Sequence, residues 1–281
     1  LAEQADQSSV PDGMNLPEEI ARREARLAAM AEAKVKIEAR AKARFEQEQA
    51  AYEATMARRE DKAKATGKKQ GGRPPTPPTA GPTPKEQINL TDDESRIMPV
   101  SGGGFEQAYN AQAAVDAASM LVVGTGVTQA CNDKAQVTPM LEHLAGLPAT
   151  LGKPDRLLGD SGFYSAANVA ACEAHGIDPF LAVKRDEHHP DPIERFSEPP
   201  PLAAEASPAQ RMAHKLKTQA GRALYTLRKQ TVEPVFGIIK SVMGFRQFLL
   251  RGLAKVSGEW MLVCMAWNLK RMAALRPKTG S

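Results

Sequence analysis

The spacing of apolar residues changes along the chain, and the first stretch that it marks out is a long helix at residues 17–66. Ala, Glu, Lys and Arg dominate this stretch, Gly is absent until Gly67, and the apolar residues are sparse and loosely periodic. Asn15 can accept hydrogen bonds from the first backbone amides, and Glu18 and Glu19 suit the positive end of the helix dipole. Such a helix cannot form a core alone, so we expect it to project, to pair with a partner or to fold back as a hairpin.

Pro and Gly dominate residues 67–87, and both residue types disfavour regular structure. We therefore expect a linker here, between the long helix and a folded domain at residues 88–275. Within that domain a polar, Pro-rich loop insertion is expected at residues 186–206. Residues 1–16 and 276–281 are expected to be tails.

Beyond Tyr109, short β-prone runs alternate with stretches of helical spacing. Asp133 can cap a helix, Asp160 directly follows a short apolar strand, and Ser165 can cap the next helix. The predicted order is strands 109–117 and 120–129 in a hairpin, helix 133–144, strand 156–159, helix 165–174, strand 179–183, and helices 207–229, 232–242 and 256–275. This order predicts a mixed α/β sheet flanked by helices.

Charge is distributed unevenly along the chain. The whole chain has 37 Lys and Arg against 33 Asp and Glu, but residues 207–281 hold 14 basic side chains and only two acidic ones, Glu233 and Glu259. This basic block carries a net charge of +12, whereas residues 70–206 carry −9. A folded block of this kind usually binds a polyanion, because each neutralised phosphate releases condensed counterions. A basic surface that only aids solubility is the alternative interpretation.

Cysteine usage and hydropathy exclude other classes of protein. Cys131, Cys172 and Cys264 form no CxxC pair and have no His at ligand spacing, so neither a disulfide framework nor a structural zinc site is expected. No apolar run reaches the roughly 18–20 residues of a membrane span, and residues 1–20 lack the core of a signal peptide. We therefore expect a cytoplasmic protein with no membrane partner.

Two carboxylates are candidates for chemistry. Asp160 would lie at the carboxyl end of a strand, where α/β folds place their active sites, and Gly159 and Gly162 would let a ligand approach the backbone. The alternative is that Asp160 serves only the turn. Glu233 lies within the basic block, where a carboxylate weakens phosphate binding unless it holds a metal ion. The alternative for Glu233 is a salt-bridged helix residue.

Together these stretches resemble the DDE transposases of bacterial insertion sequences, whose catalytic domain is ribonuclease H-like. The matching text is INLTDDESRIM (88–98), FEQAYNAQAAVD (105–116), LLGDSGFYSAANV (157–169) and the segment 225–260. The last segment holds the group's Tyr, Arg, Glu, Lys signature, here Tyr225, Arg228, Glu233 and Lys240. The gap between the Arg and the Glu is one residue longer than in the common form. The resemblance implies a ribonuclease H-like mixed sheet flanked by helices, with residues 17–66 as a helical insertion.

The resemblance also implies a mechanism and partners. Asp160 and Glu233 would be catalytic carboxylates that hold two Mg²⁺ ions, for which Mn²⁺ is expected to substitute. Lys240, two turns after Glu233, is expected on the same helix face. The residues expected to contact DNA are Tyr225, Arg228, Lys229 and Lys240. The implied function is metal-dependent cleavage and transfer of DNA strands during transposition of an insertion sequence. The expected partners are double-stranded DNA, as transposon ends and target, and a second copy in a homodimer, in the nucleoid-associated cytoplasm.

The first carboxylate of the family lies on the first strand of the sheet, and no Asp-Gly-Thr-like strand precedes Tyr109. Asp116 and Asp133 are possible substitutes, but both lie on later elements and neither is favoured. We expect that the sheet lacks its first strand and that a chain beginning at Leu1 lacks an N-terminal part with the first catalytic Asp. Two hypotheses therefore stay open: an active transposase, and an inactive remnant that only binds DNA.

Overall fold

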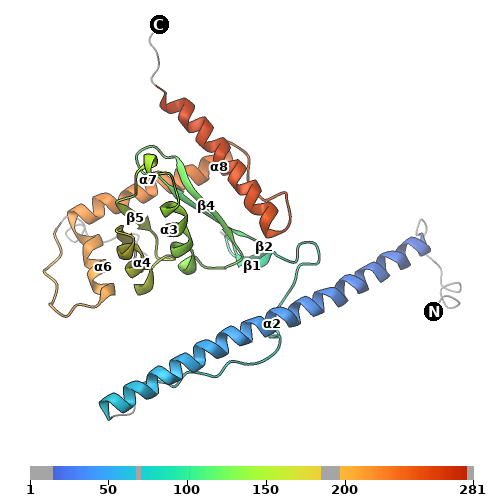
Figure 1. The fold of residues 1–281 in the computed structure, drawn as a ribbon. Helices are drawn as coiled ribbons and strands as arrows, with labels where there is room; N and C mark the ends of the chain where they lie inside the picture. Colours follow the sequence, from blue (N-terminus) through green and yellow to red (C-terminus); the bar gives the residue numbers. More distant parts are fainter. Residues whose placement is uncertain (1–14, 68–70, 101, 185–196, 277–281) are drawn as a thin grey trace, which may run out of the picture. The chain divides into compact units, whose positions relative to one another are not determined.

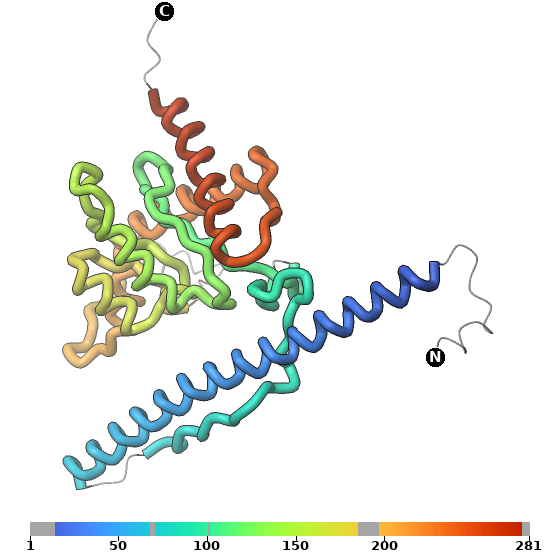
Figure 2. Tube along the Cα trace, turned by 45° about the vertical axis from the view of Figure 1, so that its right-hand side comes forward, coloured from blue at the N-terminus to red at the C-terminus, as the bar shows by residue number. Residues whose placement is uncertain are grey.

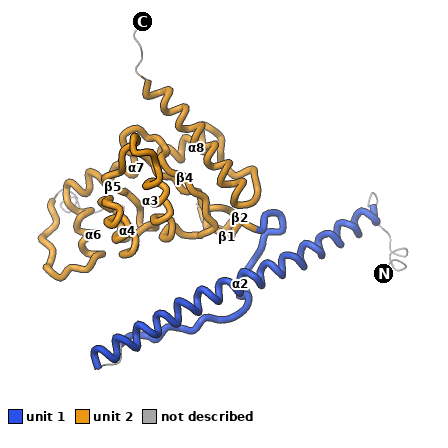
Figure 3. Tube along the Cα trace, in the orientation of Figure 1, with its two compact units in different colours: residues 1–93 blue, residues 94–281 orange. Residues whose placement is uncertain are grey.

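The computed structural model describes residues 15–67, 71–100, 102–184 and 197–276 (Figure 1). The expectations for residues 1–14, for most of the loop insertion and for the last five residues therefore lie outside the described residues. The chain divides into two compact units, Leu1–Asp93 and Glu94–Ser281 (Figure 3).

The first unit is built on one helix, α2, which spans Leu16–Thr66. Asn15 caps it by accepting from the Glu18 amide, and Gly67 ends it in the left-handed conformation with φ 66°. The sequence-based prediction of a long helix is thus confirmed, and its start differs by one residue.

The segment after α2 runs back alongside the helix, as the tube view shows (Figure 2). The Arg44 guanidinium pairs with the Glu86 carboxylate and donates to the Gly81 carbonyl at 2.9 Å. Farther along, Asp93 pairs with Lys36 at 2.8 Å. The hydrogen bond and the ion pair with Lys36 hold the pKa of the Asp93 carboxyl below its usual value. Basic side chains of α2 therefore hold a Pro-rich segment, residues 71–93, that has neither helix nor strand.

The second unit is a mixed α/β structure. Its strands are β1 (Arg96–Pro99), β2 (Phe105–Ala108), β3 (Asn110–Val115), β4 (Val122–Thr128), β5 (Arg156–Gly159) and β6 (Asp178–Leu181). Its α-helices are α3 (Val137–Ala145), α4 (Ala166–Ala174), α6 (Pro208–Lys217), α7 (Gln219–Ser241) and α8 (Leu253–Leu275). Short 3₁₀ helices lie at Lys134–Gln136 and Ala149–Leu151. No helix among the described residues is both long and apolar enough to span a membrane.

The strands form three separate pairs. β1–β2 and β3–β4 are antiparallel, whereas β5–β6 is parallel, with Gly159 opposite Leu181. The β3–β4 hairpin and the strand at 156–159 agree with the sequence-based prediction. β1 and β2 were not predicted. Their turn uses Gly102–Gly104, each with φ between 93° and 98°, a conformation that favours glycine.

Side chains alternate across the β3–β4 hairpin and separate two layers of helices. Odd-numbered residues of β3, such as Ala111 and Ala113, pack against the core formed with α7 and α8. On the other face β4 approaches α3 so closely that a Cβ at Gly124 would lie 2.6 Å from Sδ of Met140. The hairpin is therefore covered by α7 and α8 on one face and by α3 on the other (Figure 1).

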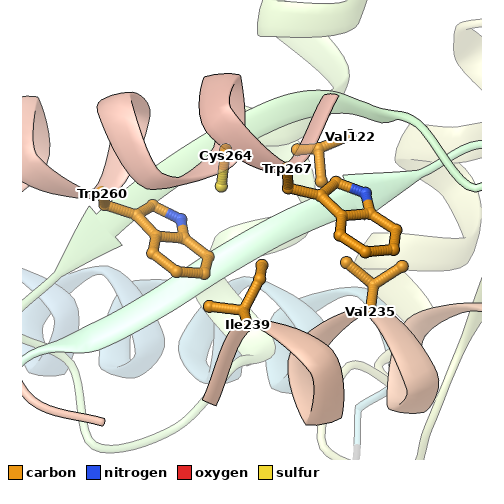
Figure 4. Packing of buried hydrophobic residues seen from close by; sticks show 6 residues of the cluster. All are labelled: Val122, Val235, Ile239, Trp260, Cys264 and Trp267. Atoms are coloured by element: carbon orange, nitrogen blue, oxygen red, sulfur yellow. The ribbon is translucent and has the colours of Figure 1, made fainter. Parts of the chain in front are cut away.

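The main core lies between α7, α8 and the hairpin. Trp260, Cys264 and Trp267 of α8 point toward α7, where Val235 and Ile239 are almost fully buried (Figure 4). The two tryptophans were predicted to be core residues, and this is confirmed. Their indole groups also donate hydrogen bonds to the hairpin, Trp260 to the Gln112 carbonyl at 2.8 Å and Trp267 to the Met120 carbonyl at 2.9 Å.

The predicted helices at 207–229 and 232–242 were divided at the wrong place. The break falls at Thr218, whose side chain accepts from the Gly221 amide and starts α7. Gly221 allows α6 and α7 to meet there, because a Cβ at this position would lie 1.9 Å from the Lys215 carbonyl oxygen. α7 also runs without interruption through residues 230 and 231, where the break was expected, and through Pro234 to Ser241. A proline removes one backbone donor, and packing of the apolar face outweighs that loss.

Thiol reactivity should report this burial. Burial raises the pKa of the Cys172 thiol to about 11 and that of Cys264 to about 12, whereas Cys131 is exposed. A thiolate-specific reagent at a pH of about 8 should therefore label only Cys131 in the native protein and all three cysteines in denaturant. Native Cys131→Ser should remain unlabelled, and rapid labelling of a second thiol in native protein would contradict this packing.

Candidate functional site

Asp160 lies where the sequence predicted, directly after the last residue of β5. Its Oδ1 accepts from the Gly162 amide at 2.8 Å, and its backbone carbonyl accepts from the Phe163 amide at 3.2 Å. Asp160 therefore shapes the turn, as one interpretation held, and lies at the end of a strand; its catalytic role stays a prediction. The turn uses only one carboxylate oxygen among the described contacts.

Asp133 does not cap a helix, in contrast to the prediction. It precedes the 3₁₀ helix Lys134–Gln136 and makes no side-chain capping hydrogen bond. Its Oδ1 instead accepts from Nδ2 of Asn110 and from Nε2 of Gln112, both at 2.7 Å. These two amides come from the same face of β3, and Gln112 is buried. Two amide donors that converge on one oxygen hold the Asp133 carboxylate in a defined orientation.

The same network is closed by bonds between its members and the backbone. Nε2 of Gln112 also donates to Oδ1 of Asn110 at 2.8 Å, and Nδ2 of Asn110 also donates to the Ala130 carbonyl at 3.3 Å. The network therefore joins β3 to the connection between β4 and α3. This is the group that sequence reasoning missed, although polar residues at two alternate positions in a run of small apolar residues were visible in the text AYNAQAAV.

An oxygen of the Asp133 carboxylate and an oxygen of the Asp160 carboxylate both lie near Gly162. A Cβ placed on Gly162 would be 3.0 Å from Oδ1 of Asp160 and 3.2 Å from Oδ2 of Asp133. Oδ1 of Asp160 and Oδ2 of Asp133 are therefore no farther apart than the sum of these two distances. The missing Cβ leaves a cradle lined by carboxylate oxygens, the hard ligands that Mg²⁺ and Mn²⁺ prefer. The chemistry of these donors suits the divalent metal that the family resemblance implies, but only two carboxylates meet here, and the described residues hold no group of three ligands.

Asp116, the other possible substitute for the first carboxylate, lies elsewhere. It directly follows β3 in the hairpin turn, and its Oδ2 accepts from the amide and the hydroxyl of Ser119. Asn110 lies at the opposite end of β3, about 20 Å away at some 3.3 Å per residue. Asp116 therefore shapes the hairpin and has no place beside Asp160.

Three members of the Tyr, Arg, Glu, Lys signature meet on α7. The Arg228 guanidinium lies over the Tyr225 ring, 5.5 Å from its centroid, and its Nη2 lies 3.4 Å from Oε1 of Glu233. Only 17% of the Arg228 side chain is exposed, and its Nε is buried without a hydrogen-bond partner among the described residues. The Glu233 side chain is 57% exposed, so Arg228 steadies a carboxylate that remains open to solvent.

Glu233 and Lys240 belong to the exposed stripe of α7, as their spacing predicted. The buried stripe of the same helix consists of Thr231, Val235 and Ile239, at intervals of four residues. α7 contacts both β3 and β5, the strands next to the Asp133 and Asp160 carboxylates. That Glu233 faces Asp160 across a cleft stays a prediction.

Basic side chains gather where α7 ends and α8 begins. Four exposed cations follow one another there: Lys240, Arg246, Arg251 and Lys255. Among the described residues no carboxylate lies within ion-pair distance of any of them, in contrast to Lys215, which pairs with Asp178. Glu259, the second acid of the basic block, accepts from the amides of Leu249 and Leu250 and so holds the connecting loop.

A comparison with protein families identifies the domain that these residues share. The model of the family described as Transposase DDE domain matches residues 76–269, and this range holds Asp133, Asp160 and Glu233. Comparison with curated proteins and with solved structures finds no significant match.

The Asp133 network should contribute measurably to stability. Asp133→Ala would leave the buried Gln112 amide without its charged acceptor, so the free energy of unfolding should fall by about 2–3 kcal/mol in urea denaturation. Asp116→Ala is the matched control, because it removes an equal charge from an exposed turn, and it should cost about 1 kcal/mol or less. Equal losses for the two variants would contradict the role of the network.

Proposed function

Because this chain belongs to the transposase DDE domain family, we propose that it cleaves and transfers DNA strands during transposition of an insertion sequence. One observation carries the proposal: within the matched range, Asp160 stands at the carboxyl end of β5 and Glu233 stands on the exposed face of α7. These are the places that the family resemblance assigns to two catalytic carboxylates.

In this proposal Asp160 and Glu233 hold two Mg²⁺ ions, for which Mn²⁺ can substitute. Such ions activate the attacking hydroxyl and stabilise charge on the entering and leaving oxygens of a phosphate. Arg228 keeps Glu233 on the side of α7 that carries Lys240. Lys240 then holds a DNA phosphate beside the carboxylates, since an exposed ammonium group can pair with a phosphate oxygen.

The proposed architecture is a ribonuclease H-like sheet. β3–β4 and β5–β6 would be its second to fifth strands, and a first strand between β3 and β5 would complete it. α7 contacts both β3 and β5, which supports a common sheet. α2 would be a helical insertion into this domain, with the residues up to 87 as the linker.

Double-stranded DNA, as transposon ends and target, is the proposed partner. Lys229, Lys240 and the cations that follow α7 are exposed and unpaired with carboxylates among the described residues. Tyr225 and Arg228 would position the DNA next to Glu233. We place the protein with the DNA of the nucleoid, in the cytoplasm.

We also propose that the active complex is a homodimer. The exposed side of α8 carries an apolar stripe with intervals of four, four and three residues: Met261, Met265, Leu269 and Met272. These four residues keep 45% to 59% of their surface exposed. A self-complementary apolar helix face suits a two-fold interface.

The alternative function is that of a remnant that binds DNA without cutting it. Among the described residues, no three His, Cys, Asp or Glu side chains are grouped so that they could hold a metal ion together. Two carboxylates hold Mg²⁺ weakly, so strand cleavage by this chain is expected to be slow. The two functions share DNA binding and differ in metal-dependent nicking.

DNA binding should be strongly salt-dependent. The logarithm of the association constant should fall linearly with the logarithm of salt concentration, by about 0.9 for each phosphate neutralised. Lys240→Ala should reduce this slope by about 1, because it removes one phosphate contact. Lys153→Ala, a control at an exposed cation outside the basic block, should leave the slope unchanged. Binding that does not respond to salt, measured by fluorescence anisotropy on a duplex, would contradict the proposal.

Nicking of a supercoiled plasmid separates the two functions. We expect slow nicking in Mn²⁺ that is lost in Asp160→Ala and in Glu233→Ala, while both variants still bind DNA. Asp116→Ala is the control for loss of one negative charge and should nick like the unaltered chain. If the unaltered chain binds DNA but never nicks it, the remnant hypothesis is correct and the enzymatic one is wrong.

A further inference from the structure

We propose that Asp133 is a metal-holding carboxylate that acts beside Asp160. This inference rests on the proposed function and adds a residue to its site. Neither the sequence pattern nor the family resemblance favoured Asp133, because it follows the hairpin and was expected to cap a helix.

The first argument is orientation. Asp133 directs Oδ1 to the amides of Asn110 and Gln112 and directs Oδ2 toward Gly162, and Asp160 directs Oδ1 toward the same glycine. Among the described residues no donor reaches Oδ2 of Asp133. The amides therefore occupy one oxygen and present the other, which is how second-shell hydrogen bonds orient a metal ligand.

The second argument is charge. Two carboxylates of this unit have a cationic partner, Asp178 with Lys215 and Glu233 with Arg228. Asp133 and Asp160 lie close to each other, and no Lys or Arg among the described residues lies within ion-pair distance of either. Two adjacent carboxylates repel each other, so a divalent cation between them would relieve that repulsion and gain two oxygen ligands.

The third argument is the space over Gly162. The backbone of Gly162 does not have a positive φ, so the local conformation does not require glycine. A side chain at position 162 would disturb the space between the two carboxylates, because its Cβ would lie in tight contact with an oxygen of each. Close approach to the two carboxylates is therefore the physical reason for a glycine here.

Mn²⁺ binding to the DNA-free protein tests the inference. In two-dimensional amide NMR, paramagnetic Mn²⁺ should first broaden the signals of Lys134, Ser161 and Gly162. Asp133→Asn keeps an acceptor for the two amides but loses the negative oxygen, and it should raise the Kd for Mn²⁺ about tenfold or more. Asp116→Asn, with the same chemical change in the hairpin turn, should leave the Kd unchanged.

Gly162→Ala gives a second, independent variant that removes no ligand and keeps the Asp133 network. It should also weaken Mn²⁺ binding, because its methyl group fills the cradle. If Asp133→Asn and Gly162→Ala bind Mn²⁺ as tightly as the unaltered chain, Asp133 is not a ligand and the inference is wrong. The inference is equally wrong if Mn²⁺ leaves the signals around Asp133 and Asp160 sharp.

These outcomes are separate from those of the proposed function. A chain that binds Mn²⁺ at Asp133 but neither binds nor nicks DNA would overturn the function and leave the metal site. A chain that nicks DNA, with Mn²⁺ binding unchanged in Asp133→Asn, would overturn the inference and leave the function.

Discussion

Gln112 connects the core of the α/β unit to its candidate site. Its backbone carbonyl accepts from the Trp260 indole of α8, and its side-chain amide donates to Asp133. The first bond fixes where β3 lies against the helices, and the second fixes where the Asp133 carboxylate points. Because Gln112 is buried, neither bond can be exchanged for water without cost. The position of Asp133 beside Asp160 therefore depends on packing that begins at α8.

Much of the fold could be predicted from local sequence patterns. The long helix, the β3–β4 hairpin, the strand that ends before Asp160 and the buried tryptophans of α8 all follow from periodicity and capping residues. The break between α6 and α7 could not be predicted in this way. It depends on the close approach of Gly221 to a carbonyl of α6, whereas the sequence-based prediction placed the break between residues 229 and 232.

The candidate site was predictable only in part, for the same reason. Asp160 was found because a carboxylate after a short apolar strand is a local signal. Asp133 also carried a local signal, that of a helix cap, but that interpretation was wrong. Its carboxylate is used by two amides 21 and 23 residues earlier in the chain, and such pairings are set by tertiary structure. On α7, Arg228 and Glu233 lie five residues apart and do pair, although the gap is longer than in the common form of the signature.

The central claim is that Asp133 and Asp160 together form one side of a metal site. The most direct measurement is the anomalous scattering of Mn²⁺ in a crystal of the protein. The account predicts a peak over Gly162, with carboxylate oxygens of Asp133 and Asp160 at about 2.0–2.3 Å, typical of a small divalent cation with oxygen ligands. A peak bound by Asp160 and Glu233 alone, with Asp133 still contacting only Asn110 and Gln112, would contradict it.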